Sequence, residues 1–296
     1  MNNIFVRSIY FIAFFVVFFV LVNVAYMTVI AKTDSDFKKR VESSQFNGLD
    51  LDLVVFGAST VLDGVDTELL TSRGIKSYNF AIGGASIRTN IIQLEEYLKT
   101  CSVKPESLIL GLNSSMVDTF DDEEIQPIVE VTMEDHKYSL NDVPILKFKW
   151  LGFEFLKKLM SKTHREAILS YGQVKFEKTV TDYTSYVEQY LDIQRFENSF
   201  WIGEMIIVCR EHDIELILIE MPGYRMTQNL SPAGLHVIMH SNGHQAKLYN
   251  YNSRDFCSIF DSEKDWIGNS HLNVRGAEKF TEVLLTVLQE SNQESN

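Results

Sequence analysis

Four short stretches of the chain carry residues that could together perform acyl transfer. This chemistry needs a nucleophilic hydroxyl, a base beside it, and hydrogen-bond donors for the oxyanion of the tetrahedral intermediate. Ser59 could supply the hydroxyl and His271 the base, while the Gly84 amide and the Asn113 side chain could supply donors. In this hypothesis Ser59 attacks an acyl carbonyl and His271 accepts its proton.

Ser59 follows an unbroken apolar run, Leu53 to Phe56. Such a run, bounded by a turn signal, predicts a strand of a parallel sheet that is covered on both faces. Ligands of open α/β sheets bind outside the carboxyl ends of the strands, so Ser59 stands where chemistry is usually done. The alternative is that Ser59 only caps the helix that we expect over Asp63 to Arg73.

The rest of the chain supplies the elements that would position these residues. The first third alternates strand and helix, which predicts βαβ units and a parallel sheet. Further expected elements are strands at Ser77–Ile82, Ser107–Leu112, Ile214–Ile219 and Leu248–Tyr251, and helices at Ser86–Thr100, Phe196–His212 and Val274–Gln289. We therefore predict a three-layer α/β/α domain with a central, mostly parallel sheet over residues 50–296.

The middle of the chain has a weaker pattern. We expect a helical insertion at about residues 116–195, with helices over Ile145 to Ser161 and Arg165 to Tyr171. This insertion would either cover the top edge of the sheet or form a lid over a pocket, and the sequence leaves both open.

The N-terminus carries the clearest physical signal. No charged residue occurs from Ser8 to Ala31, and a helix of this length spans the roughly 30 Å hydrocarbon layer. The run is too long for a cleaved signal peptide. We therefore predict a single-pass anchor over residues 1–31 and a polar stalk over residues 32–49.

The orientation of this anchor is open to two arguments. Counted literally, the basic residues after the apolar run would place the domain in the cytoplasm. Short N-terminal tails ahead of a single anchor nevertheless commonly stay inside. We expect the domain on the extracytoplasmic side of the cell membrane.

Composition excludes one class of partner. The 296 residues carry a formal net charge of -13, whereas nucleic-acid binding needs clustered Lys and Arg. The three cysteines lack metal-ligand spacing and are interpreted as small buried hydrophobes, with a Cys209–Cys257 bridge left open. His236, His240 and His244 recur every fourth residue among poor helix formers, which favours a polar rim over a metal site. We predict no metal and no cofactor.

The four stretches also resemble a known family. Gly57-Ala-Ser-Thr60, Asn79 with Gly84, Gly111-Leu-Asn113, and His271-Leu-Asn273 with Gly276-Ala277 resemble blocks I, II, III and V of the SGNH (GDSL-like) hydrolases. The resemblance covers roughly residues 50–115 and 200–290. It implies a flavodoxin-like sheet, Ser59 as nucleophile, His271 as base, and an oxyanion hole formed by the amides of Ser59 and Gly84 and the Asn113 side chain.

Two positions depart from the family pattern. Ala58 stands where the family usually has Asp, and Gly268 stands where its acid is expected, three residues before the histidine. We predict Asp265 as the acid, provided that the segment after it bulges. Asp261 is a further candidate, and a backbone carbonyl could otherwise orient His271.

Two more side chains are candidates for substrate binding. Arg88 follows the glycine block closely enough to touch a substrate, and Trp266, beside the histidine loop, could stack on a sugar ring. The alternatives are a solvated helix start for Arg88 and plain packing for Trp266.

These features predict a membrane-anchored serine esterase or O-acyltransferase acting on acyl esters, acetyl foremost, of a cell-envelope glycan. The chain also resembles wall D-alanylation and exopolysaccharide acetylation proteins, which implies a membrane-bound O-acyltransferase as partner. One alternative is an inactive SGNH-like scaffold that binds glycan or supports such a complex. A second is a cytoplasmically facing α/β binding module in which Ser59 is an ordinary cap.

Overall fold

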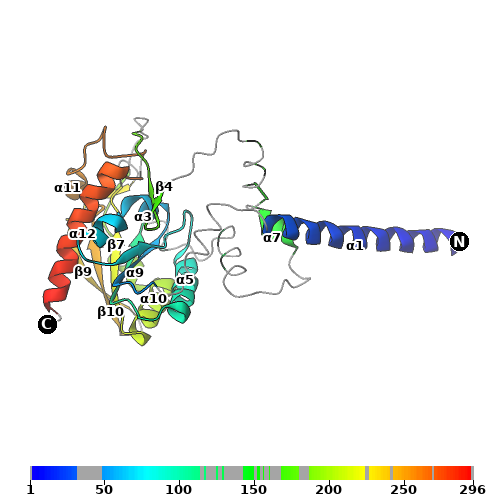
Figure 1. Ribbon diagram of the computed structural model, residues 1–296, viewed down its shortest axis with the longest axis horizontal. Coiled ribbons are helices and arrows are strands. Elements are labelled where there is room, and N and C mark those ends of the chain that lie inside the picture. The colour runs from blue at the N-terminus through cyan, green and yellow to red at the C-terminus, as the bar shows by residue number, and fades with distance from the viewer. Residues whose placement is uncertain are drawn as a thin grey trace.

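A six-stranded sheet forms the centre of the domain in the computed structural model of the chain (Figure 1). The structure describes residues 2–31, 49–113, 117, 125, 129, 143–149, 152–153, 156, 160, 168–179, 187–223, 227–240, 243–268 and 270–294. Across the sheet the strands are ordered β2 (Ser77–Asn79), β1 (Leu53–Gly57), β3 (Ser107–Leu112), β7 (Glu215–Glu220), β10 (Gln245–Asn250) and β9 (Gly234–Met239).

The sheet is mixed and mostly parallel. The five strands from β2 to β10 pair in parallel, and β9 pairs antiparallel with β10 at one edge. The chain adds β2 on one side of β1 and then returns to add β3 on the other. The order therefore reverses between β1 and β3, which is the position where open α/β sheets bind their ligands. The predicted parallel sheet is confirmed, whereas the antiparallel edge strand was not predicted.

Helices cover both faces of this sheet because its strands are apolar on both sides. One face packs against α5 (Ile87–Thr100) and α10 (Phe200–Glu211), and the other against α3 (Ser59–Gly64), α4 (Thr67–Ser72) and α12 (Val274–Glu294). Along β1, Val54 and Phe56 join the first core, while Leu53 and Val55 join the second. In Figure 1, α5 and α10 lie on one side of the sheet and α12 on the other.

The helix predicted over Asp63 to Arg73 is wrong at its start. The structure has two short helices there, and the first, α3, begins at Ser59. Other short helices are α9 (Ile193–Glu197) and α11 (Arg254–Cys257). The start of α3 matters for the site, because it places Ser59 and Asp63 one helical turn apart.

The middle of the chain contains strands where helix was predicted. Ile168–Ser170, inside the predicted helix Arg165 to Tyr171, is strand β4, and it pairs antiparallel with β5 (Gln173–Lys175). The turn residues Tyr171 and Gly172 both have positive φ, at 49° and 86°, as the type I′ form of a two-residue hairpin loop requires. Another small sheet joins β6 (Val187–Gln189) to β8 (Thr227–Asn229). Most of the insertion predicted at 116–195 lies outside the described residues.

The N-terminal helix α1 (Asn2–Ala31) has the length and apolar character of a membrane span. Its stretch Ile4–Thr28 has a mean hydropathy of 2.6, and residues 4–21 of it are all exposed. A short helix, α7 (Pro144–Lys147), packs beside its C-terminal end (Figure 1). The predicted stalk lies outside the described residues, except for Leu49.

Candidate functional site

Three of the predicted site residues lie at the carboxyl ends of neighbouring strands. Ser59 follows β1, Asn113 follows β3, and the glycine turn Gly83–Gly84 follows β2, with β1 between the other two strands. The Ile82 amide donates to the Gly57 carbonyl at 3.2 Å, which keeps the glycine turn alongside the end of β1. A Cβ atom placed on Gly83 would lie 3.7 Å from the Ser59 Cβ. The structure therefore brings the candidate nucleophile and the candidate oxyanion hole to one edge of the sheet.

Two glycines allow α3 to begin directly at that edge. Gly57 and Gly111 are paired across β1 and β3, and Val61 of α3 packs on both. A Cβ on either glycine would come within 2.3 Å of a Val61 methyl carbon, which is impossible without movement. Gly57 also has a φ of 152°, a conformation that favours glycine. These contacts give a packing reason for both glycines in the Gly-x-Ser and Gly-x-Asn patterns.

Ser59 is not the cap of its helix. The N-cap position of α3 is Ala58, with extended backbone angles and no side-chain cap bond. Ser59 is partly exposed, and its hydroxyl makes no hydrogen bond with another residue in the part of the chain that the structure describes. Within that same part, the amides of Ser59 and Gly84 are also unused, and Gly84 is exposed with a φ of 81°. These N–H groups can therefore bind an added acceptor.

His271 is held by Asp63, not by Asp265. Its Nδ1 lies 2.8 Å from the Asp63 Oδ2, and only 8% of the Asp63 side chain is exposed. A carboxylate accepts hydrogen bonds, so this contact places the proton of a neutral imidazole on Nδ1 and leaves Nε2 as the basic nitrogen. Residues four apart on a helix are neighbours on one face, so the imidazole on Asp63 lies on the side of α3 that carries Ser59.

Asp265, the acid predicted from sequence, has a different role. Its carboxylate is fully buried and faces α12, where it lies 2.5 Å from the Lys279 Nζ and 3.2 Å from the Arg275 Nε. It also accepts the Asp261 amide at 2.7 Å. Lys279 and the Asp261 amide hydrogen-bond to Oδ2, and Arg275 forms an ion pair with Oδ1. The Asp265 carboxylate therefore faces these groups while His271 pairs with Asp63, so the predicted pairing of Asp265 with His271 is wrong.

Asp261, the other acidic candidate, is also engaged elsewhere. Its Oδ1 accepts the Glu263 amide at 2.9 Å, and Lys264 lies 3.3 Å from its other oxygen. The hydrogen bond from the Glu263 amide is the largest cause that lowers the pKa of this carboxyl. It acts together with the hydrogen bond and charge of Lys264 and the charge of Arg275, and the pKa lies below its usual range. Asp261 belongs to the loop before the histidine and shapes that loop.

The residues after His271 fix its loop to the start of α12. The Asn273 side chain accepts the Gly276 amide at 3.1 Å, which caps the helix, and its Nδ2 donates to the Lys264 carbonyl at 2.6 Å. A Cβ on Gly276 would lie 2.3 Å from the Asp265 carbonyl oxygen, so only glycine allows this approach. The His-Leu-Asn-x-x-Gly pattern is therefore a device for holding His271 in place.

Other contacts fix α3 from the opposite side. The Asn79 Nδ2 donates to the Val61 and Val65 carbonyls at 2.9 and 3.2 Å, which ties the helix to the end of β2. The Gln173 Nε2, from β5, donates to the Asp63 carbonyl at 3.1 Å. Beyond β5, the Phe176 carbonyl accepts the Val274 amide at 3.0 Å, at the start of α12. The hairpin strand β5 thus joins the helix that carries Asp63 to the helix that follows His271.

The two predicted substrate-binding side chains have structural contacts. Trp266 is 1% exposed and packs edge-on against Phe260 with ring centroids 5.3 Å apart, so the predicted stacking on a sugar is wrong. The Arg88 guanidinium lies 5.4 Å from the centre of the Trp201 ring, which links α5 to α10. A role of Arg88 towards substrate stays a prediction.

In the described part of the chain, the histidines and cysteines outside this site form no further centre. His236 lies in β9, and the His240 amide donates to the His244 carbonyl across the β9–β10 turn, so the three do not share a helix face. Among the residues that the structure describes, no group of His, Cys, Asp and Glu could hold a metal ion. All three cysteines are free thiols, and burial raises the pKa of Cys209 to about 12.

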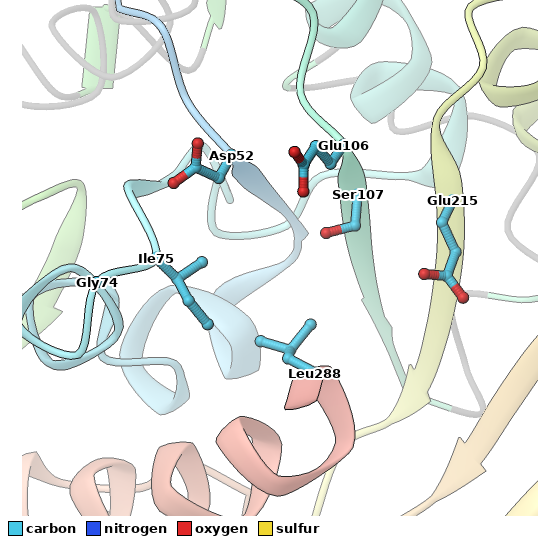
Figure 2. A pocket seen from close by; sticks show the side chains of 7 residues that line it. All are labelled: Asp52, Gly74, Ile75, Glu106, Ser107, Glu215 and Leu288. Atoms are coloured by element: carbon cyan, nitrogen blue, oxygen red, sulfur yellow. The ribbon is translucent and has the colours of Figure 1, made fainter. Parts of the chain in front are cut away.

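A cavity of about 290 Å³ lies at the opposite edge of the sheet, at the amino ends of the strands (Figure 2). Its lining carries three carboxylates, Asp52, Glu106 and Glu215, with Ser107, Gly74, Ile75 and Leu288. Asp52 accepts the Lys76 amide at 2.8 Å, and Glu215 pairs with Lys247 at 3.0 Å. No imidazole lines it, so this cavity lacks the base that acyl transfer requires.

Comparison with known proteins gives no assignment. A scan against protein-family models finds no match for this chain, and a search of curated proteins finds none either.

Proposed function

We propose that this chain is a membrane-anchored serine esterase or O-acyltransferase of SGNH type, acting on acyl esters, acetyl foremost, of a cell-envelope glycan. The observation that carries the proposal is the 2.8 Å contact between the His271 Nδ1 and the Asp63 Oδ2. In serine hydrolases the acid binds this nitrogen and leaves Nε2 for the hydroxyl. The acid lies one turn after Ser59 on the same helix, which supports a Ser59–His271–Asp63 triad.

The reaction follows from these roles. The Ser59 Oγ attacks the acyl carbonyl carbon while the His271 Nε2 takes the hydroxyl proton. The oxyanion accepts hydrogen bonds from the Ser59 and Gly84 amides and from the Asn113 side chain. When the intermediate collapses, the sugar oxygen leaves with the proton from His271, and the acyl group remains on Ser59. Water or a second sugar hydroxyl then attacks the acyl carbonyl carbon, and its proton passes to His271. As the acyl group leaves, His271 returns this proton to the Ser59 Oγ.

The fold supports the same proposal. Helices pack on both faces of a mostly parallel sheet, as a three-layer SGNH domain requires, and the candidate residues stand beside the strand-order reversal. The acid departs from the family pattern, because Asp63 stands four residues after Ser59 and not three residues before His271. A carboxylate is recognised by its contact with the imidazole and not by its place in the sequence.

The N-terminal helix supports an envelope substrate. A tethered domain meets surface polymers at a high effective concentration. In this proposal the domain lies outside the cytoplasmic membrane and works beside a membrane-bound O-acyltransferase. Protease treatment of intact cells tests the sidedness: digestion of the domain supports it, and protection until lysis contradicts it and favours a cytoplasmic binding module.

Two measurements on the purified full-length chain test the activity. The first is the intact mass after mixing with p-nitrophenyl acetate, where we expect an added acetyl group that maps to Ser59. The second is acetate release from an O-acetylated polysaccharide, with and without an unacetylated oligosaccharide as acceptor. Release without acceptor indicates an esterase, and acetylated acceptor indicates a transferase. If Ser59 stays unmodified and neither product forms, the enzymatic proposal fails.

One observation favours a second candidate, a catalytically inactive scaffold that binds glycan. Within the described residues the Ser59 hydroxyl makes no hydrogen bond, so Ser59 and His271 are not hydrogen-bonded to each other in this structure. Catalytic hydrogen bonds are often long before substrate binds, which is why the enzyme is preferred. A Ser59→Ala chain that binds acetylated polysaccharide as tightly as wild type and retains its full biological effect would favour the scaffold.

A further inference from the structure

The segment around α7 carries an exposed apolar surface whose purpose the proposed function does not explain. Its exposed fractions are 70% for Leu146, 65% for Phe153, 52% for Leu156 and 83% for Met160. Four large apolar side chains exposed to this degree within one segment are unusual for a soluble surface, and exposed apolar surface of this kind marks protein or membrane contacts. We call these four side chains the α7 apolar surface.

This segment is fixed to the membrane-span candidate by specific contacts. The Asn23 Oδ1, in α1, accepts the Ile145 amide at 3.1 Å, and the Tyr26 hydroxyl donates to the Phe148 carbonyl at 2.8 Å. A Cβ on Gly152 would lie 2.5 Å from the Tyr26 hydroxyl oxygen, so the absence of a side chain allows close packing there. The α7 segment and α1 therefore form one packed unit.

The contact between Asn23 and Ile145 satisfies hydrogen-bonding groups of both helices. Asn23 is a polar residue within an apolar span, and a polar group in lipid needs a partner. Its Nδ2 donates to the Phe19 carbonyl at 2.9 Å, and α7 supplies the second partner. In return, α7 has no side-chain cap of its own, and Asn23 accepts one of its unpaired N-terminal amides. Asn23 is only 6% exposed as a result.

The position of these contacts along α1 sets the depth of the segment. Asn23 lies five residues before Thr28, the end of the apolar span, which is about 7 to 8 Å at 1.5 Å per residue. Interfacial segments bury their apolar side chains about 5–10 Å into the boundary between headgroups and acyl chains. Tyr26 is of the residue type that is enriched at that level.

We infer that the α7 apolar surface lies in the lipid of the same membrane that α1 spans, as a second contact between the chain and the bilayer. Lys147 and Lys149, beside it in the chain, are positively charged and are attracted to the negative surface potential of anionic lipids, so the lipid class is anionic. The described residues 143–149, 152–153, 156 and 160 then belong to the membrane surface and not to a lid over Ser59. This inference does not depend on the proposed enzymatic activity.

The test uses the full chain reconstituted into vesicles of phosphatidylcholine and phosphatidylglycerol. Leu146→Cys and Phe153→Cys are each labelled with an environment-sensitive NBD dye in a Cys101→Ser background, because Cys209 and Cys257 are buried. The matched control is Phe200→Cys, a side chain of 55% exposure on α10, which lies outside the α7 segment. Quenching by lipids that carry a spin label near the headgroup end of the acyl chain reports the depth.

We expect blue-shifted emission and strong quenching at positions 146 and 153, and neither at position 200. An Asn23→Ala chain should show weaker quenching at position 146, because the contact that sets the depth of α7 is lost. If both dyes emit as in water and escape quenching, like the control, the inference is overturned, and the surface then fits a protein partner instead.

Discussion

The two edges of the central sheet differ in a way that separates a cavity from a site. The amino edge has the cavity of about 290 Å³, but its polar lining consists of carboxylates and one hydroxyl. The carboxyl edge combines a hydroxyl, unused backbone N–H groups and an imidazole bonded to a buried carboxylate. Both edges belong to the same strands. A cavity alone therefore does not point to acyl transfer, and the proposed function rests instead on the combination of a hydroxyl, an imidazole and a buried carboxylate.

The largest expected effect is the loss of the nucleophile. Ser59→Ala should lower the rate of p-nitrophenyl acetate hydrolysis on the order of 10⁶-fold, down to the buffer background, because no acyl-enzyme can form. Ser107→Ala is the matched change at the other edge, and it should keep the wild-type rate. Equal hydrolysis rates in wild type and Ser59→Ala would show that the carboxyl edge of the sheet is not the site of this reaction.

The next effect comes from the acid. Asp63→Asn should lower kcat about 10⁴-fold, as expected when the group that fixes the histidine tautomer becomes an amide. Glu106→Gln, the same kind of change at the amino edge, should leave kcat unchanged. Steady-state kinetics on both variants measures the contrast, and a comparable loss in the two would show that general charge, not the contact with His271, is responsible.

A third variant separates positioning from catalysis within the carboxyl edge. Asp265→Asn removes a buried charge that pairs with Lys279 and Arg275, so it should lower the free energy of unfolding by about 1–3 kcal/mol. Its effect on kcat should stay within a few-fold at temperatures where the chain is folded. Urea unfolding measures the change in the free energy of unfolding. A loss of kcat as large as that of Asp63→Asn, in a fully folded variant, would restore Asp265 as the acid.

The smallest effect concerns Lys175, in the strand that joins α3 to the start of α12. Partial burial lowers its pKa, but the hydrogen bond to Glu68 and the charges of Asp66 and Glu68 outweigh burial, and the pKa is raised overall. The group therefore stabilises the fold below the unfolded pKa of 10.5, and this contribution is lost as the pH rises through the folded value.

Lys175→Gln should accordingly lower the free energy of unfolding by up to about 1 kcal/mol at neutral pH. The difference in free energy of unfolding between wild type and variant should disappear at pH values above the folded pKa of Lys175. Urea titrations of both proteins across this range measure this difference. A difference that persists unchanged at high pH would show that the packing of the lysine stem, and not its charge, matters.

Much of the fold could be predicted from the sequence because the central strands of its sheet are buried. The apolar runs that became β1, β3 and β7 needed no tertiary information, and the charge-free run that became α1 was equally clear. The hairpin of β4 and β5 was missed because its turn depends on two positive φ angles at Tyr171 and Gly172, which local helical periodicity does not reveal.

The pairing of Asp63 with His271 could not be predicted for a related reason. The helix after β1 was expected to start near Asp63, which would have placed that carboxylate at a helix start with no relation to Ser59. It starts at Ser59 because Gly57 and Gly111 leave room for Val61 against the strand ends. The two glycines were the available signal, since a helix that begins there puts Asp63 one turn beyond the hydroxyl.

The most direct measurement is the rate at which a fluorophosphonate modifies Ser59 in four full-length chains: wild type, His271→Ala, Asp63→Asn and Asp265→Asn. Intact mass gives the rate and peptide mapping gives the site. We predict a single adduct on Ser59 that forms rapidly in wild type and Asp265→Asn and far more slowly in the other two. Absence of the adduct in wild type, or equal rates in all four chains, would contradict a Ser59–His271–Asp63 triad.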